Sequence, residues 1–153
     1  MPGKVDAVAV HIYDATPAAV LGDLAWFRGR LAGAGLETTP MALNETGWYT
    51  RGDGGLPPIP DPRGAGYLRR LAEVAPRTDC GLIGFAPHTW VTRERNPADP
   101  EDWYGIANPA TGTPYGSGVA YGEAVRLLQG RGPGPAPTET VPVCGASGQG
   151  GTP

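Results

Sequence analysis

The stretch Pro40-Met41-Ala42-Leu43-Asn44-Glu45-Thr46-Gly47-Trp48 decides the fold of this 153-residue chain. A short apolar run ends in an amide and a carboxylate, and glycine and tryptophan follow. Two other runs end in the same way: Val5 to Val10 leads into His11-Ile12-Tyr13, and Gly81 to Ala86 leads into Pro87-His88-Thr89-Trp90. A buried strand that stops at polar and aromatic residues is typical of a ligand-binding edge, because parallel α/β folds bind ligands at the carboxyl ends of their strands.

Helical patterns separate these runs and follow the last one. Thr16-Pro17 supplies an N-cap and a first-turn proline, and the spacing of apolar residues then predicts a helix. Its apolar face comprises Val20, Leu24, Phe27 and Leu31. Pro62 opens a second helix, and a third is expected near 114–129. With strands at about 5–12, 39–44 and 80–86, the sequence predicts an α/β fold of three consecutive β-α units with parallel strands and right-handed crossovers.

Regular alternation along each strand predicts which residues share a face. Counting back from His11, Glu45 and Trp90 places Ala9, Leu43, Met41, Ala86 and Gly84 on the face of the site. The other face, expected to pack under the helices, comprises Val8, Val10, Ala42, Ile83 and Phe85.

Composition narrows the classes of function. The net charge is -3 and 18% of the residues are charged, so no basic surface for nucleic acid is expected. No apolar run is long enough for a membrane span. Met1 to Lys4 leads directly into a predicted strand, so no signal peptide is expected in this chain.

The cysteines and the C-terminal segment complete the organisation. Cys80 and Cys144 lack metal-ligand spacing; Cys80 is expected as a small core residue, and a disulfide between the two is not expected. Residues 130–153 hold seven glycines and five prolines in 24 residues, a composition that cannot bury enough apolar surface to fold. We therefore predict one domain at 1–129 and a Gly/Pro-rich disordered tail at 130–153.

The motifs resemble the C-terminal part, strands six to eight, of a (β/α)8 TIM-barrel retaining glycoside hydrolase. The clan concerned carries catalytic glutamates at the ends of strands four and seven and includes glycoside hydrolase families 39 and 5. His11-Ile12-Tyr13 resembles the motif that closes strand six, and Asn44-Glu45-Thr46-Gly47-Trp48 resembles the strand-seven motif. Trp90 resembles the tryptophan of strand eight, and Asp102-Trp103-Tyr104-Gly105-Ile106 resembles part of the following loop.

The resemblance implies a role for each motif. Glu45 corresponds to the nucleophile that forms a covalent glycosyl-enzyme. Tyr13 is expected to hydrogen-bond Glu45, and His11 to bond the same carboxylate or a sugar hydroxyl. Trp90 is expected to offer its ring to a carbohydrate substrate.

For the other candidate sugar-binding residues the sequence allows two interpretations each, one functional and one structural. Asn44 reaches the sugar 2-hydroxyl or only shapes the turn, and His88 binds a hydroxyl or packs the loop. Trp48, Trp103 and Tyr104 line outer subsites or pack their loops. The acidic residues Asp99, Glu101 and Asp102 are expected to form a solvated loop. No metal site and no cofactor are expected, because the two histidines lie on different strands and no phosphate-binding glycine loop opens a helix.

The departures from the family matter as much as the resemblance. A barrel of this type needs eight strands and about 250 residues. The sequence contains one Asn-Glu pair, so the acid/base glutamate of strand four has no counterpart. We expect a fragment that is inactive alone and that either needs the missing N-terminal barrel half or self-associates. The alternative is a non-catalytic carbohydrate-binding or interaction module. Localisation stays open, although the resemblance implies a parent that is secreted.

Overall fold

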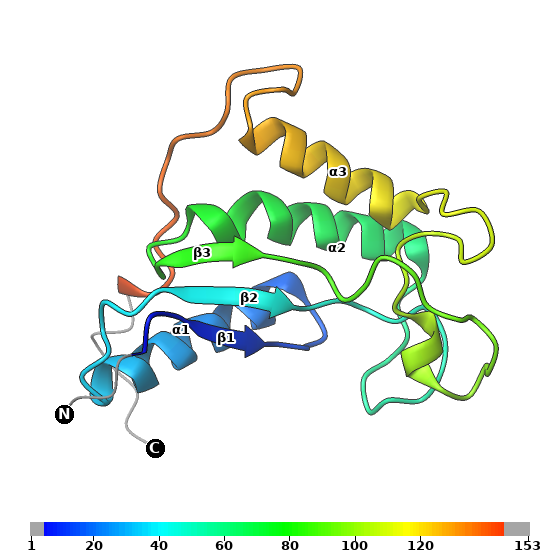
Figure 1. The fold of residues 1–153 in the computed structure, drawn as a ribbon, viewed down its shortest axis with the longest axis horizontal. Coiled ribbons are helices and arrows are strands. Elements are labelled where there is room, and N and C mark those ends of the chain that lie inside the picture. The colour runs from blue at the N-terminus through cyan, green and yellow to red at the C-terminus, as the bar shows by residue number, and fades with distance from the viewer. Residues whose placement is uncertain (1–4, 146–153) are drawn as a thin grey trace.

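The computed structural model describes residues 5–145. Its three strands form one parallel sheet in the order β1-β2-β3 and alternate with three helices (Figure 1). The elements are β1 Val8–His11, α1 Pro17–Gly33, β2 Met41–Glu45, α2 Asp61–Val74, β3 Leu82–Phe85 and α3 Gly116–Leu128, with short 3-10 turns η1 Ala75–Arg77 and η2 Pro100–Trp103. This confirms the predicted α/β class with three consecutive β-α units, the arrangement of part of a barrel.

The helices begin where local chemistry favours them. The Oγ1 of Thr16 accepts a hydrogen bond from the backbone N–H of Ala19, at 3.2 Å, and Pro17 fills the first helical position of α1. α2 also has a proline in its first turn, Pro62, but its N-cap residue is Pro60 and no side chain caps its first turn. No helix within residues 5–145 is both long and apolar enough to cross a membrane.

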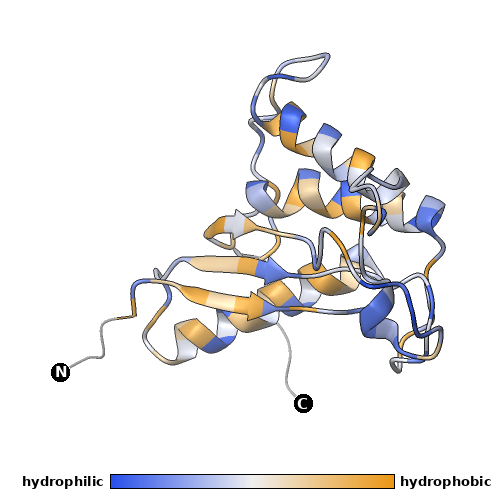
Figure 2. Cartoon of the chain, turned by 45° about the vertical axis from the view of Figure 1, so that its right-hand side comes forward, coloured by the Kyte–Doolittle hydropathy of each residue, from blue (hydrophilic) through white to orange (hydrophobic). Residues whose placement is uncertain are grey.

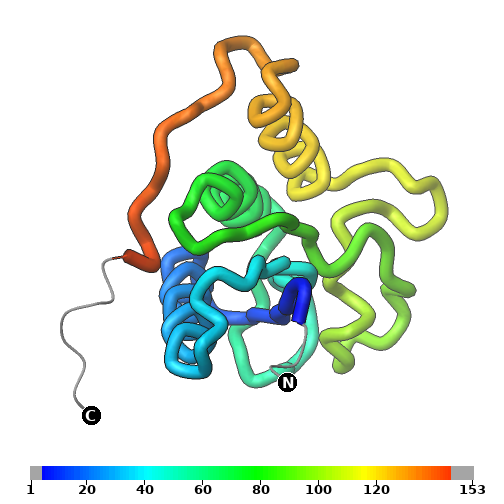
Figure 3. The backbone as a smooth tube through the Cα atoms, turned by 60° about the vertical axis from the view of Figure 1, so that its left-hand side comes forward, coloured from blue at the N-terminus to red at the C-terminus, as the bar shows by residue number. Residues whose placement is uncertain are grey.

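The core lies between the sheet and helices α1 and α2. Figure 3 shows both helices on one side of the strands. The largest fully buried side chains of this layer include Leu24 of α1, Met41 and Leu43 of β2, and Leu71 of α2. Figure 2 shows hydrophobic residues along the strands and hydrophilic ones at the carboxyl end of β2. α3 packs along α2, and its Tyr121 lies 6.0 Å from the ring of Phe85.

Two register shifts overturn part of the predicted face assignment. Met41 and Leu43 are fully buried under the helices, whereas we expected them on the site face and Ala42 under the helices. Ile83, also expected under the helices, is 67% exposed. The pairing shifts between Val10 and His11 and between Met41 and Ala42, so a simple count of two fails at those points.

The opposite face of the sheet has no helix over it among the described residues. Ala9, Asn44, Ile83 and Gly84 are exposed there. β1 and β3 are the edges of this sheet, and each offers backbone groups for pairing. The protein therefore presents a parallel sheet that is covered on one side, which is unusual for this class.

The segment after α3 runs back to the amino end of the sheet (Figure 1). Val141 forms a parallel bridge with Thr78, and the carboxylate of Asp79 accepts hydrogen bonds from the backbone N–H groups of Val143, Cys144 and Gly145 at 2.7–2.8 Å. Cys80 and Cys144 form a disulfide, so the expectation that they stay unpaired is wrong. The physical reason is the path of the chain, which returns 64 residues later to the start of β3. Residues 146–153 of the predicted tail lie outside the described residues.

Candidate functional site

The carboxylate of Glu45 is the centre of the polar edge at the carboxyl ends of β1 and β2. The hydroxyl of Tyr13 donates a hydrogen bond to Glu45 Oε2 at 3.0 Å, and Nδ1 of His11 lies 3.1 Å from the same oxygen. The register shift pairs His11 directly with Glu45 and so brings the two side chains together. Sequence reasoning placed all three residues at this edge, and in the structure Tyr13 and His11 both contact the same oxygen of Glu45.

Tyr13 is held as a neutral hydrogen-bond donor. Burial raises the pKa of the Tyr13 phenol well above its usual value, and the hydrogen bond and charge of Glu45 raise it further. The side chain of Glu45 is 34% exposed, so a ligand can reach the carboxylate from solvent. The arrangement keeps one oxygen of Glu45 bonded and leaves the residue accessible.

His88 reaches the same edge from the loop after β3. Its ring lies edge-on to Tyr13, with centroids 5.9 Å apart, and edge-on to Tyr104 at 5.2 Å. The close approach needs Gly47, because a Cβ at that position would lie 2.5 Å from the carbonyl oxygen of His88. The backbone N–H of His88 donates to the carbonyl of Thr46 at 2.7 Å and fixes the loop on β2.

The other predicted site residues are placed differently. The indole of Trp48 donates to the carbonyl of Asp14 at 2.8 Å and packs edge-on against Tyr67, which favours its loop-packing reading. Trp90 is 48% exposed, two residues beyond His88. Asn44 is exposed next to Glu45 on β2. The structure therefore groups His11, Tyr13, Glu45 and His88, with Trp90 and Asn44 exposed at the margins.

Sequence reasoning missed one contributor, Glu101, and left the role of a second, Tyr104, open between lining an outer subsite and packing its loop. Glu101, expected in a solvated loop, lies with its Oε2 3.6 Å from Nε2 of His88. Tyr104 is buried between Tyr13 and Tyr49, and burial together with the charge of Glu101 raises the pKa of Tyr104 to about 12. Only the path of a long loop brings these residues here, and no local pattern in the sequence carries that information.

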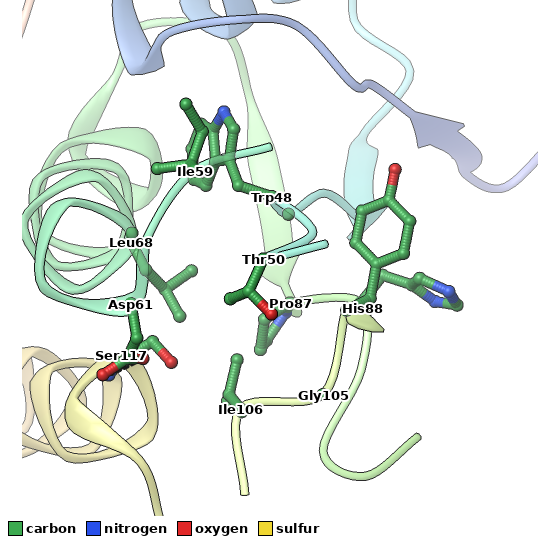
Figure 4. A pocket seen from close by; sticks show the side chains of 13 residues that line it. Trp48, Thr50, Ile59, Asp61, Leu68, Pro87, His88, Gly105, Ile106 and Ser117 are labelled. Carbon is green, nitrogen blue, oxygen red and sulfur yellow. Dashed lines mark hydrogen bonds between the residues drawn. The ribbon is translucent and has the colours of Figure 1, made fainter. Parts of the chain in front are cut away.

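A small cavity lies behind the site, between the loops and the first turns of α2 and α3 (Figure 4). His88 lies at one end and Asp61 and Ser117 at the other, and Tyr104 also lines the cavity. Its volume of about 20 Å³ has room for one water molecule. The cavity is too small for a sugar ring, and Glu45 is not among the residues that line it.

The described residues offer one grouping of possible metal ligands, Asp79, Cys80 and Cys144. Both sulfurs are consumed in the disulfide, so neither can act as a thiolate ligand.

Comparison with known proteins gives limited similarity. No protein-family model matches the chain, and no curated protein matches it. Among solved structures, it is similar to XEG5B, a GH5 xyloglucan-specific beta-1,4-glucanase from a ruminal metagenomic library, in complex with XXLG. The match has 16% sequence identity and a TM-score of 0.44, and it covers 86% of this chain and 40% of that chain. The chain thus spans well under half the length of this glucanase.

Proposed function

We propose that the chain carries the nucleophile-bearing part of a retaining glycoside hydrolase site, with Glu45 as the nucleophile. The supporting observation is that Tyr13 and His11 both bind Oε2 of Glu45, at 3.0 and 3.1 Å. Two partners on the same oxygen hold the carboxylate in a fixed orientation, as nucleophilic attack requires.

In the proposed reaction, the second oxygen of Glu45, Oε1, attacks the anomeric carbon. The bond from that carbon to the leaving-group oxygen breaks, and a covalent glycosyl-enzyme forms. Water then attacks the same carbon and releases Glu45. Among residues 5–145 the side-chain hydrogen bond and the ion pair of Glu45 both involve Oε2, which leaves Oε1 for the attack.

The proposed site needs a second carboxyl group, because an acid has to protonate the leaving group. The sequence has no second Asn-Glu pair, and loss of general-acid catalysis costs about 10²–10⁴-fold in rate. We propose that a complementary polypeptide, either the N-terminal half of a barrel or another copy of the chain, adds to the open sheet and completes the site. Within residues 5–145 the sheet has two unpaired edges and one uncovered face, and both support this proposal.

Covalent labelling tests the role of Glu45 without the missing acid. The reagents are the 2,4-dinitrophenyl 2-deoxy-2-fluoro-β-glycosides of glucose, xylose and mannose, whose leaving group departs unprotonated. We expect mass spectrometry to find one fluoroglycosyl group on the peptide that contains Glu45. Glu45→Gln should abolish the label, and the control Glu37→Gln, an exposed residue after α1, should keep it. Labelling at another residue, or none with any of the three reagents, would refute the assignment.

The second candidate function is a non-catalytic sugar-binding or interaction module. Trp90, which is 48% exposed and lies two positions after His88 in the chain, favours it, since an exposed aromatic residue can bind a sugar without any catalytic acid. In that case the chain binds sugars, is never labelled, and Glu45→Gln changes only the affinity. Labelling and binding measured on the same samples separate the two functions.

A further inference from the structure

A second hollow, which we name the Glu94 pocket, opens among the loops on the side of α2 and α3. It is lined by Thr50, Asp61, Glu94, Trp103, Gly105 and Tyr115 and has a volume of about 230 Å³. Pockets for drug-sized ligands measure roughly 300–1,000 Å³, so this one suits a single small ring or polyol. None of its lining residues belongs to the group around Glu45.

Two carboxylates provide the polar wall. The hydroxyl of Tyr115 donates to Glu94 Oε1 at 2.9 Å and lies 3.1 Å from Oε2. Asp61 accepts the backbone N–H groups of Gly116 and Ser117, each at 3.0 Å. Neither carboxylate takes part in the ion pairs found within residues 5–145. Each carboxylate oxygen can accept more than one hydrogen bond, so both groups can still receive hydroxyl donors from a ligand.

Trp103 provides the apolar wall. Its indole N–H donates to the carbonyl of Asn96 at 2.8 Å, which fixes the ring. The guanidinium of Arg51 lies 4.6 Å from the ring centroid. This cation partly offsets the charges of Glu94 and Asp61, so the pocket does not require a cationic ligand, and a neutral ligand with hydroxyl groups can donate to both carboxylates.

The pocket is formed before any ligand binds. The backbone N–H of Glu94 donates to the carbonyl of Asp102 at 3.0 Å, and that of Thr50 donates to the carbonyl of Trp103 at 3.1 Å. At Gly105 a Cβ would lie 2.7 Å from the backbone nitrogen of Thr92, so the backbone near Gly105 packs closely against the backbone near Thr92. Walls fixed in this way reduce the entropy lost on binding.

We propose that the Glu94 pocket binds one neutral sugar unit or polyol, with Glu94 and Asp61 accepting hydroxyl hydrogens and Trp103 packing on the C–H face. The choice of a sugar as ligand rests on the proposed function. Glu45 does not line the pocket, so binding there does not depend on the proposed reaction at Glu45.

The test uses the indole N–H signals of the four tryptophans in ¹H–¹⁵N spectra, assigned by single Trp→Phe variants. The probes are the methyl β-glycosides of glucose, xylose, mannose and galactose. We expect at least one of them to shift the Trp103 signal saturably. Glu94→Gln should weaken that binding about tenfold or more, because it removes the charge from the acceptor. Tyr115→Phe should weaken it less, and the control Glu37→Gln should not change it.

Labelling of Glu45 and the Trp103 signal are independent measurements, and together they keep the two proposals separate. If Glu45→Gln removes labelling but leaves the Trp103 shift intact, both proposals stand. If labelling fails while the Trp103 shift responds to Glu94→Gln, only the proposed function falls. The pocket proposal is overturned if none of the four glycosides shifts Trp103 saturably, or if Glu94→Gln leaves the affinity unchanged.

Discussion

The hydrogen bond between Tyr13 and Glu45 is the central contact at the carboxyl ends of β1 and β2. The phenol is partly buried and donates to a carboxylate, and both conditions favour its neutral form. Because the phenol keeps its proton, it can donate a hydrogen bond that holds the carboxylate of Glu45 in place. The pair therefore behaves as one hydrogen-bonded unit, and its loss should be visible in stability as well as in labelling.

The raised pKa of Tyr13 predicts how stability depends on pH. In the unfolded chain this phenol ionises near its usual value of about 10, whereas the folded chain retains the proton to higher pH. The folded state then binds more protons, so its stabilisation is complete below about pH 10 and declines as the pH rises further. The free energy of unfolding, measured with urea between about pH 8 and 11, should decline less steeply with pH for Tyr13→Phe than for wild type.

Glu45→Gln gives the matched control for this experiment. It removes the charge of the acceptor but leaves Tyr13 buried, and burial is the larger cause of the shift. The free energy of unfolding of Glu45→Gln should decline with pH less steeply than that of wild type and more steeply than that of Tyr13→Phe. Identical slopes for wild type and Tyr13→Phe would show that the phenol of Tyr13 does not ionise at a higher pH in the folded chain than in the unfolded chain.

At the scale of elements, α3 depends on a residue from another helix. Its first backbone N–H groups, at Gly116 and Ser117, are bonded by Asp61, the first residue of α2, rather than by a cap of its own. We expect Asp61→Ala to lower the free energy of unfolding by about 0.5–2 kcal/mol, the range for lost N-caps. The control Asp53→Ala, in the exposed loop before α2, should change the free energy of unfolding little. If Asp61→Ala and Asp53→Ala lowered it equally, Asp61 would not cap α3.

Elements were predictable from the sequence where a local pattern controls them. Thr16-Pro17 and the apolar spacing of α1 are local, and the three strands and three helices appear in the expected order. The faces of β2 were not predictable, because Met41 and Leu43 are turned under the helices by register shifts that depend on neighbouring strands. The contact of Glu101 with His88 was equally hidden, since it depends on the course of a loop of more than ten residues.

At the scale of the molecule, the segment after α3 closes the amino end of the sheet opposite Glu45. Val143 and Cys144 pack against the hydrophobic core, and the carboxylate of Asp79 receives three backbone N–H groups from this segment. The hydrogen bonds from Val143 and Cys144 lower the pKa of Asp79. This contribution to stability is present above the usual pKa of an aspartate and is lost as the pH falls through the lowered value.

The disulfide between Cys80 and Cys144 should therefore matter more to stability than the glycine-rich composition of the segment suggests. It closes a loop of 64 residues, for which the loop-entropy relation gives a stabilisation of about 4 kcal/mol. We expect dithiothreitol to lower the midpoint of thermal unfolding of the wild type by several degrees or more. The double variant Cys80→Ala/Cys144→Ala should unfold at a lower temperature from the start and should not respond to the reductant. A wild type whose midpoint stays the same after verified reduction would show that Asp79 and the core contacts hold the segment without the disulfide.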